Sequence, residues 1–108
     1  MEVYLFEGCG VHMSAYFISD ASVKNADALE TFRARAAASV SQYGGRYLVR
    51  ASLIEPVEGT WKPEAIIVIE FSDLERARAW YQSPEYASAL QVRDAAISRH
   101  LILVDGIG

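Results

Sequence analysis

The pattern of apolar and polar positions predicts a strand and then a helix in the first part of the chain. Between Ala15 and Val23, β-branched and aromatic residues mix with Ser and Asp, which is typical of a strand. Asn25 is a residue type that caps helices, and apolar residues then recur at spacings of three and four. The stripe consists of Leu29, Phe32, Ala36, Val40 and Tyr43. Gly44 and Gly45 end the helix, because glycine adopts the left-handed conformation at little cost.

A second strand is expected from Arg46 to Ile54. Strict alternation places Arg46 and Arg50 on the same face of this strand. Two interpretations stay open for this pair: charges that keep an edge strand solvated, or a cationic wall of a ligand pocket. Glu55 to Pro63 contains two prolines and a glycine, which indicates a loop.

The second half of the chain repeats the alternation of strand and helix. Ile66 to Ile69 is apolar on both alternating faces, which predicts a central strand with both faces covered. Ser72 and Glu75 form a capping box for one helix, and Ser83-Pro84-Glu85 begins a second one. Leu101 to Val104 is expected as the last strand.

The order β-α-β-β-α-β predicts an α+β fold of the ferredoxin-like kind, with a four-stranded antiparallel sheet and the helices on one face. Residues 13–108 form a single domain, and residues 1–12 are an N-terminal extension of doubtful relevance. Because the central strand is apolar on both sides, we expect a homodimer whose sheets pack face to face as a dimeric α/β barrel, with room for a pocket.

Composition and charge narrow the class of protein. The 108 residues carry a formal charge of −4 and include 52% hydrophobic residues. An acidic chain repels phosphate, and the strand from Ala65 to Phe71 lacks the basic and aromatic pattern of RNA-recognition domains, so we expect no nucleic-acid partner. No apolar run is long enough for a membrane span. The single Cys9 favours a reducing compartment, and we expect a cytoplasmic protein.

The candidate site rests first on two charged residues in apolar surroundings. Arg93 lies on a helical stripe with Leu90 and Ile97, and Glu70 ends the apolar central strand. A buried guanidinium needs a partner, so we expect Arg93 to pair with Glu70. The pair is either purely structural or binds an anion. His100 has the chemistry of a general base, although a surface position at the start of a strand is the simpler interpretation.

Polar-tipped aromatic residues supply the other candidates. Most of them are expected to pack in the core, with a few reaching a cavity. The expected pocket walls are Tyr16, Tyr43, Trp80 and Tyr86. No motif for a metal, a phosphate-binding loop or a nucleophile elbow is present, so we expect neither a metal nor a cofactor.

Short blocks spread over most of the chain carry a family resemblance. They are Ala15-Tyr16, residues 44–50, Glu58-Gly59 with Trp61 and Pro63, Ile69-Glu70-Phe71, residues 79–86, Arg93 and residues 103–106. Together they resemble the bacterial domain-of-unknown-function (DUF) family thirteen-thirty, within the dimeric α/β-barrel superfamily. The resemblance implies the ferredoxin-like fold and a dimer, but no reaction, because the superfamily includes monooxygenases, isomerases and haem-degrading enzymes.

Three hypotheses for function follow. The first is a homodimer that binds a small, partly apolar or anionic metabolite, with Glu70 and Arg93 as the polar floor of the pocket. The second is a cofactor-independent enzyme of the monooxygenase or isomerase type, in which Glu70 or His100 acts as base and Arg93 stabilises an oxyanion. The third is a structural dimerisation module without a cavity.

Overall fold

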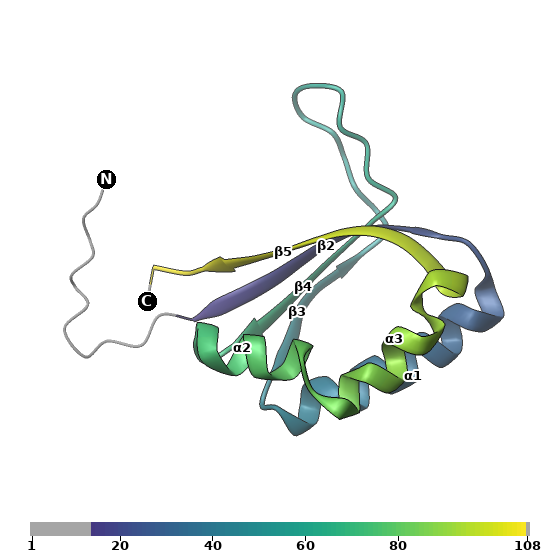
Figure 1. The fold of residues 1–108 in the computed structure, drawn as a ribbon. Helices are drawn as coiled ribbons and strands as arrows, with labels where there is room; N and C mark the ends of the chain where they lie inside the picture. Colours follow the sequence, from purple (N-terminus) through teal and green to yellow (C-terminus); the bar gives the residue numbers. More distant parts are fainter. Residues whose placement is uncertain (1–13, 108) are drawn as a thin grey trace.

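The computed structural model describes residues 14–107, which form one layer of strands and one layer of helices (Figure 1). The expected extension at residues 1–12, with Cys9, lies outside the described residues. The elements, in chain order, are β2 (Ala15–Val23), α1 (Ala26–Gln42), β3 (Arg46–Ala51), β4 (Ala65–Phe71), α2 (Leu74–Tyr81), α3 (Pro84–Ala96) and β5 (Ile97–Asp105).

The sheet has the strand order β3-β4-β2-β5, and all three neighbouring pairs are antiparallel. All helices lie on one side of it, and the loop between β3 and β4 projects from the other side (Figure 1). The predicted four-stranded antiparallel α+β fold is therefore confirmed.

Side-chain caps explain where the helices begin. The Asn25 side chain accepts a hydrogen bond of 2.8 Å from the amide of Ala28, as expected for the cap of α1. Ser83 caps α3 through the amide of Tyr86 at 3.0 Å. The cap of α2 is Asp73 and not Ser72, so the predicted capping box is wrong by one residue. A carboxylate accepts this bond as well as a hydroxyl does and also suits the positive end of the helix dipole.

Strand β3 departs from the predicted alternation. It ends at Ala51 rather than Ile54, and its register with β4 shifts between Tyr47 and Val49. A bulge inserts one residue and so exchanges the faces of the residues that follow it. Arg46 consequently lies opposite Glu70, whereas Arg50 lies opposite Ile67. Because these two partners on β4 are three residues apart, the expectation that both arginines share a face is wrong.

Strand β5 also differs from its predicted bounds. It begins at Ile97, directly after α3, and not at Leu101. Arg99 is thereby placed within the strand, paired with Ala21 of β2. Ala21 is buried on the side of the sheet that faces the helices, so Arg99 points to the same side.

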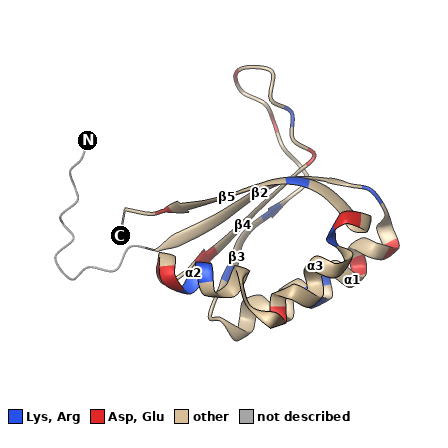
Figure 2. Ribbon diagram, viewed as in Figure 1, with Lys and Arg blue, Asp and Glu red and all other residues tan. Residues whose placement is uncertain are grey.

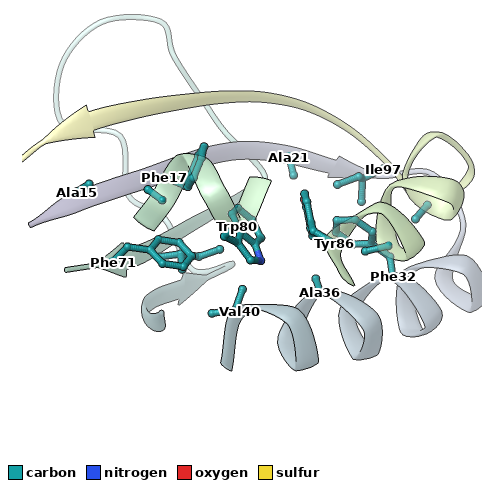
Figure 3. Packing of buried hydrophobic residues seen from close by; sticks show 14 residues of the cluster. Ala15, Phe17, Ala21, Phe32, Ala36, Val40, Phe71, Trp80, Tyr86 and Ile97 are labelled. Carbon is teal, nitrogen blue, oxygen red and sulfur yellow. The ribbon is translucent and has the colours of Figure 1, made fainter. Parts of the chain in front are cut away.

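Trp80 is the centre of the core between the two layers (Figure 3). Its ring centroid lies 5.1 Å from that of Phe17, 5.3 Å from that of Phe71 and 4.1 Å from that of Tyr86. Its Nε1 donates a 2.9 Å hydrogen bond to Oγ of the buried Ser39 on α1. Trp80 therefore joins both layers, and its one polar atom is satisfied.

The Ser39→Ala variant is expected to lower the free energy of unfolding by about 1 to 3 kcal/mol, because the buried indole N–H of Trp80 loses its acceptor. Urea unfolding followed by circular dichroism measures this loss. Ser41→Ala is the matched control, since Ser41 is exposed on the same helix. Equal stability of the two variants would contradict the assigned role of Ser39.

Candidate functional site

Tyr16 and Glu70 lie on the face of the sheet that carries no helix. They are paired across β2 and β4, next to Ala15 and Phe71, which are buried on the helix side. Glu70 accepts a 2.7 Å bond from Nε of Arg46 and a 3.2 Å bond from the hydroxyl of Tyr16. The Arg46 hydrogen bond holds the pKa of Glu70 below its ordinary value; desolvation opposes this effect, and the Tyr16 bond supports it.

Arg93 does not meet Glu70. It lies on α3, on the other side of the sheet, and its Nε is 3.2 Å from the carboxylate of Asp94. The predicted Glu70–Arg93 ion pair is wrong, because the alternation of β4 directs Ile69 toward the helices and Glu70 away from them. The two residues cannot form the floor of one pocket.

The remaining predicted residues separate in the same way. Trp80 and Tyr86 are buried between the layers and line a cavity there. Tyr43 lies at the end of α1, where its hydroxyl donates a 2.9 Å bond to Glu85, and this bond raises the pKa of Tyr43. His100 is exposed on the open face of β5. The structure thus brings the predicted residues together in two separate pairs, Trp80 with Tyr86 on the helix side and Tyr16 with Glu70 on the open face, and disperses the others.

The cavity lies between the sheet and the helices and has a volume of about 100 Å³. Its apolar walls come from the sheet, from α1 and from the buried aromatic residues; they include Phe17, Ile67, Ile69, Leu101, Leu29, Phe32, Ala36, Trp80 and Tyr86. Its polar lining residues are Ser19, Arg33, Arg50, Arg99 and the hydroxyl-bearing Tyr47. Within the described chain, no carboxylate or histidine lines this cavity.

The three arginines at the cavity have no carboxylate partner among residues 14–107. Arg50 stacks over the ring of Tyr47 at 4.8 Å, and Arg99 lies 5.6 Å over the ring of Phe32. Arg99 also donates a 2.8 Å hydrogen bond to the hydroxyl of Tyr86. Burial raises the pKa of Tyr86 and the positive charge of Arg99 opposes this rise, so the hydroxyl stays protonated at neutral pH.

Ser19 adds a polar group to the sheet wall of the cavity. Its side chain is 5% exposed, and its hydroxyl makes no hydrogen bond within the part of the chain that the structure describes. A buried hydroxyl without a partner costs free energy, and such a group is unusual in a core. The Ser19 hydroxyl is therefore a polar group, with no hydrogen bond among residues 14–107, in a mostly apolar cavity wall.

Of these polar residues, sequence reasoning offered only Arg50, as part of a cationic pocket wall together with Arg46. Arg33 follows Leu29 by four positions, so it shares the helix face of that apolar stripe and could have been found. Arg50 was placed on the wrong face by the bulge, and Arg99 was placed before the strand in which it lies. Ser19 carried no signal beyond its place in a strand.

Among residues 14–107, no group of three or more His, Cys, Asp or Glu is arranged to hold a metal ion. No helix in the same range is long and apolar enough to cross a membrane.

The sheet order, the helices on one face and the interlayer cavity define an α+β protein of the ferredoxin-like class. The chain belongs to the domain-of-unknown-function family DUF1330, whose profile matches residues 14–107. The family resemblance of the sequence is confirmed. A comparison with curated proteins gives no match.

Solved structures share this fold at low sequence identity. The RPA0582 protein of Rhodopseudomonas palustris, of unknown function, has a TM-score of 0.73 and 13% identity over 87% of this chain and 82% of its own. SnoaB, a cofactor-independent oxygenase of Streptomyces nogalater, has a TM-score of 0.61 and 19% identity over 85% and 91%. A dimeric ferredoxin-like protein of unknown function from Bacteroides fragilis has a TM-score of 0.57 and 13% identity over 85% and 95%.

The lowered pKa of Glu70 predicts a pH-dependent contribution to stability. A carboxylate with a lowered pKa stabilises the fold above its unfolded pKa, and this contribution is lost as pH falls through its folded pKa. The Glu70→Gln variant is therefore expected to lose stability at pH 7 and to approach the wild type on the acid side. Urea unfolding between about pH 7 and pH 3 measures the difference.

A double-mutant cycle with Arg46→Gln attributes this effect to the ion pair. We expect the double variant to be no less stable than either single variant. Fully additive losses would show that Glu70 acts through another group.

Proposed function

We propose that this protein binds a small, partly apolar, anionic molecule in the cavity between sheet and helices. The observation that carries the proposal is the charge of the cavity lining, which among residues 14–107 contains three guanidinium groups and no carboxylate, in a protein of net charge −4. Arginine forms paired hydrogen bonds with carboxylates and phosphates, so an anion would satisfy groups that have no ionic partner.

The remaining features of the cavity support the same class of ligand. Its walls favour an apolar body, and the Ser19 hydroxyl offers one directional hydrogen bond. A cavity of about 150 Å³ lined by Leu, Ile and Phe accepts the six carbon atoms of benzene, so one of about 100 Å³ suits an apolar group of about four or five carbon atoms. Short alkyl or cyclic carboxylates fit both requirements.

The residues that line the cavity support binding of a ligand better than they support catalysis of a reaction. The enzymatic alternative, as first assigned, needs Glu70 or His100 in one site with Arg93, but Glu70 and His100 lie on the open face while Arg93 lies on the helix side. No acidic residue or histidine among the described residues lines the cavity. The fold shared with SnoaB keeps oxygenase-type chemistry as an alternative for this cavity, without the residues first assigned to it. A purely structural module would not need a cationic cavity.

We also propose that the protein is a homodimer with paired open sheet faces. One apolar row crosses all four strands on this face: Val49, Val68, Ile18 and Ile102 are successive register partners. Val49 on the edge strand β3 is 38% exposed and Ile102 on the edge strand β5 is 56% exposed, so the row presents uncovered apolar surface. A second copy would cover the row, and the related Bacteroides fragilis protein is dimeric. The proposed location is the cytoplasm, supported by a single cysteine in 108 residues.

Filling the cavity tests the proposed ligand site, with hexanoate as the probe. Ala36→Leu places additional carbon atoms in the cavity and is expected to weaken hexanoate binding about tenfold, the equivalent of two buried methylene groups. Ser19→Ala, which leaves the packing unchanged, is expected to weaken it about two- to tenfold by removing one hydrogen bond. Isothermal titration calorimetry measures both affinities.

Ala38→Leu is the matched control, because Ala38 is exposed on the same helix and does not line the cavity. Circular dichroism verifies that each variant is folded. Wild-type affinity in both Ala36→Leu and Ser19→Ala would contradict a ligand site in this cavity.

Substitution of Val68 by lysine tests the dimer. A charge at the centre of the apolar row is costly to bury, so Val68→Lys is expected to sediment as a monomer where the wild type sediments as a dimer. Ala38→Lys on the exposed side of α1 is expected to remain dimeric. A wild-type chain that is monomeric at micromolar concentration in sedimentation velocity would exclude the proposed interface.

A further inference from the structure

A second hollow, of about 400 Å³, lies beside the apolar cavity at the edge of the sheet formed by β5. Its lining residues are Lys24, Tyr81, Arg93, Asp94, Ile97, Ser98, Arg99 and Leu101. Three of them, Ile97, Arg99 and Leu101, also line the apolar cavity. The two spaces are therefore neighbours across one short stretch of β5, with Arg99 at their boundary.

Positive charge dominates the second hollow. Its lining contains Lys24, Arg93 and Arg99 against one carboxylate, that of Asp94. Figure 2 shows Lys and Arg segments, in blue, around the end of α3 and the beginning of β5. The Asp94 carboxylate is 88% exposed and contacts only the Nε side of Arg93, so solvent screens much of its charge. A positive surplus of this kind is suited to an anion.

Main-chain hydrogen bonds hold the three cations near one another. Helix α3 ends at Ala96, and β5 begins at the next residue, so no loop separates Arg93 from Arg99. The amide of Lys24 donates a 2.8 Å bond to the carbonyl of Ala96, which ties the end of β2 to this junction. The Lys24 ammonium in turn donates a 2.6 Å bond to the carbonyl of Asp94. The charges are thus positioned before any ligand arrives.

We propose that the two hollows are the two halves of one binding site for a small amphipathic carboxylate. The apolar body occupies the cavity under the helices, and the carboxylate lies in the second hollow between Arg93, Lys24 and Arg99. This inference rests on the proposed function and adds to it the position of the anionic group and the residues that select it.

The burial of the arginines favours this orientation over the reverse one. Arg33 and Arg50, which line the cavity but not the second hollow, are exposed, whereas Arg99 is half-buried and the Arg93 side chain is 32% exposed. A charge in a concave, partly dry site interacts more strongly with an anion than a charge in open solvent does. The hydrogen bond from Arg99 to the hydroxyl of Tyr86 also orients the guanidinium group of Arg99.

Hexanoate and hexan-1-ol distinguish the two halves of the site, because they share an alkyl chain and differ in the charged group. The titrations use Trp61→Phe protein, which removes the exposed indole and leaves Trp80, in the cavity wall, as the fluorescent reporter. Arg93→Gln and Lys24→Gln are each expected to weaken hexanoate about three- to tenfold and to leave hexan-1-ol unchanged. Arg78→Gln is the control, since Arg78 is exposed on α2 and lines neither hollow.

The outcomes separate this inference from the proposed function. If Arg50→Gln weakens hexanoate and Arg93→Gln does not, the carboxylate lies outside the second hollow and the inference is overturned, while the cavity remains a ligand site. If hexan-1-ol binds as tightly as hexanoate to the wild type, no cation selects the ligand and the inference is likewise overturned. If neither compound binds the wild type at millimolar concentration, the proposed function fails and the inference fails with it.

Discussion

The packing of Trp80 is the interaction on which the arrangement of the two layers depends. Its indole contacts Phe17 and Phe71 of the sheet and Tyr86 of α3, and its N–H bonds to Ser39 of α1. A rigid ring of this size holds the layers in contact at one place, and its hydrogen bond fixes the position of α1 relative to α2. Trp80 packs in the core and also lines the cavity, so one residue both joins the two layers and forms part of the cavity wall.

The position of the helices gives the two faces of the sheet different roles. On the covered face, Ile69 and its neighbours bury apolar surface and leave a hollow with arginines at its edge. On the open face, the Glu70–Arg46–Tyr16 group is a polar island beside an apolar row. In the proposed dimer, this hydrogen-bonded group would favour one register of the two packed sheets, because polar groups must meet polar partners whereas apolar rows can slide past one another.

Sequence signals that act over a few residues were sufficient to predict the helices, the strands and the fold. They were not sufficient to predict which residues line the cavity. The Asn25 and Ser83 caps and the glycines after α1 act within a few residues, so the sequence contains them directly. The central strand is apolar on both faces, and alternation therefore could not reveal that Glu70 points away from the helices. The bulge in β3 and the direct passage from α3 into β5 depend on tertiary pairing, and they decide where Arg50 and Arg99 point.

The partners of the three cations around the second hollow also bear on whether an anion can enter. Arg99 rests on a neutral hydroxyl and an aromatic ring, Lys24 on a main-chain carbonyl, and Arg93 on an exposed carboxylate. None of these contacts is a buried ion pair, so an incoming carboxylate has no strong internal bond to displace. Neighbouring cations repel one another in the empty site, and an anion among them removes that repulsion. In the proposed site, the free energy of anion binding would therefore include relief of this repulsion in addition to the new hydrogen bonds.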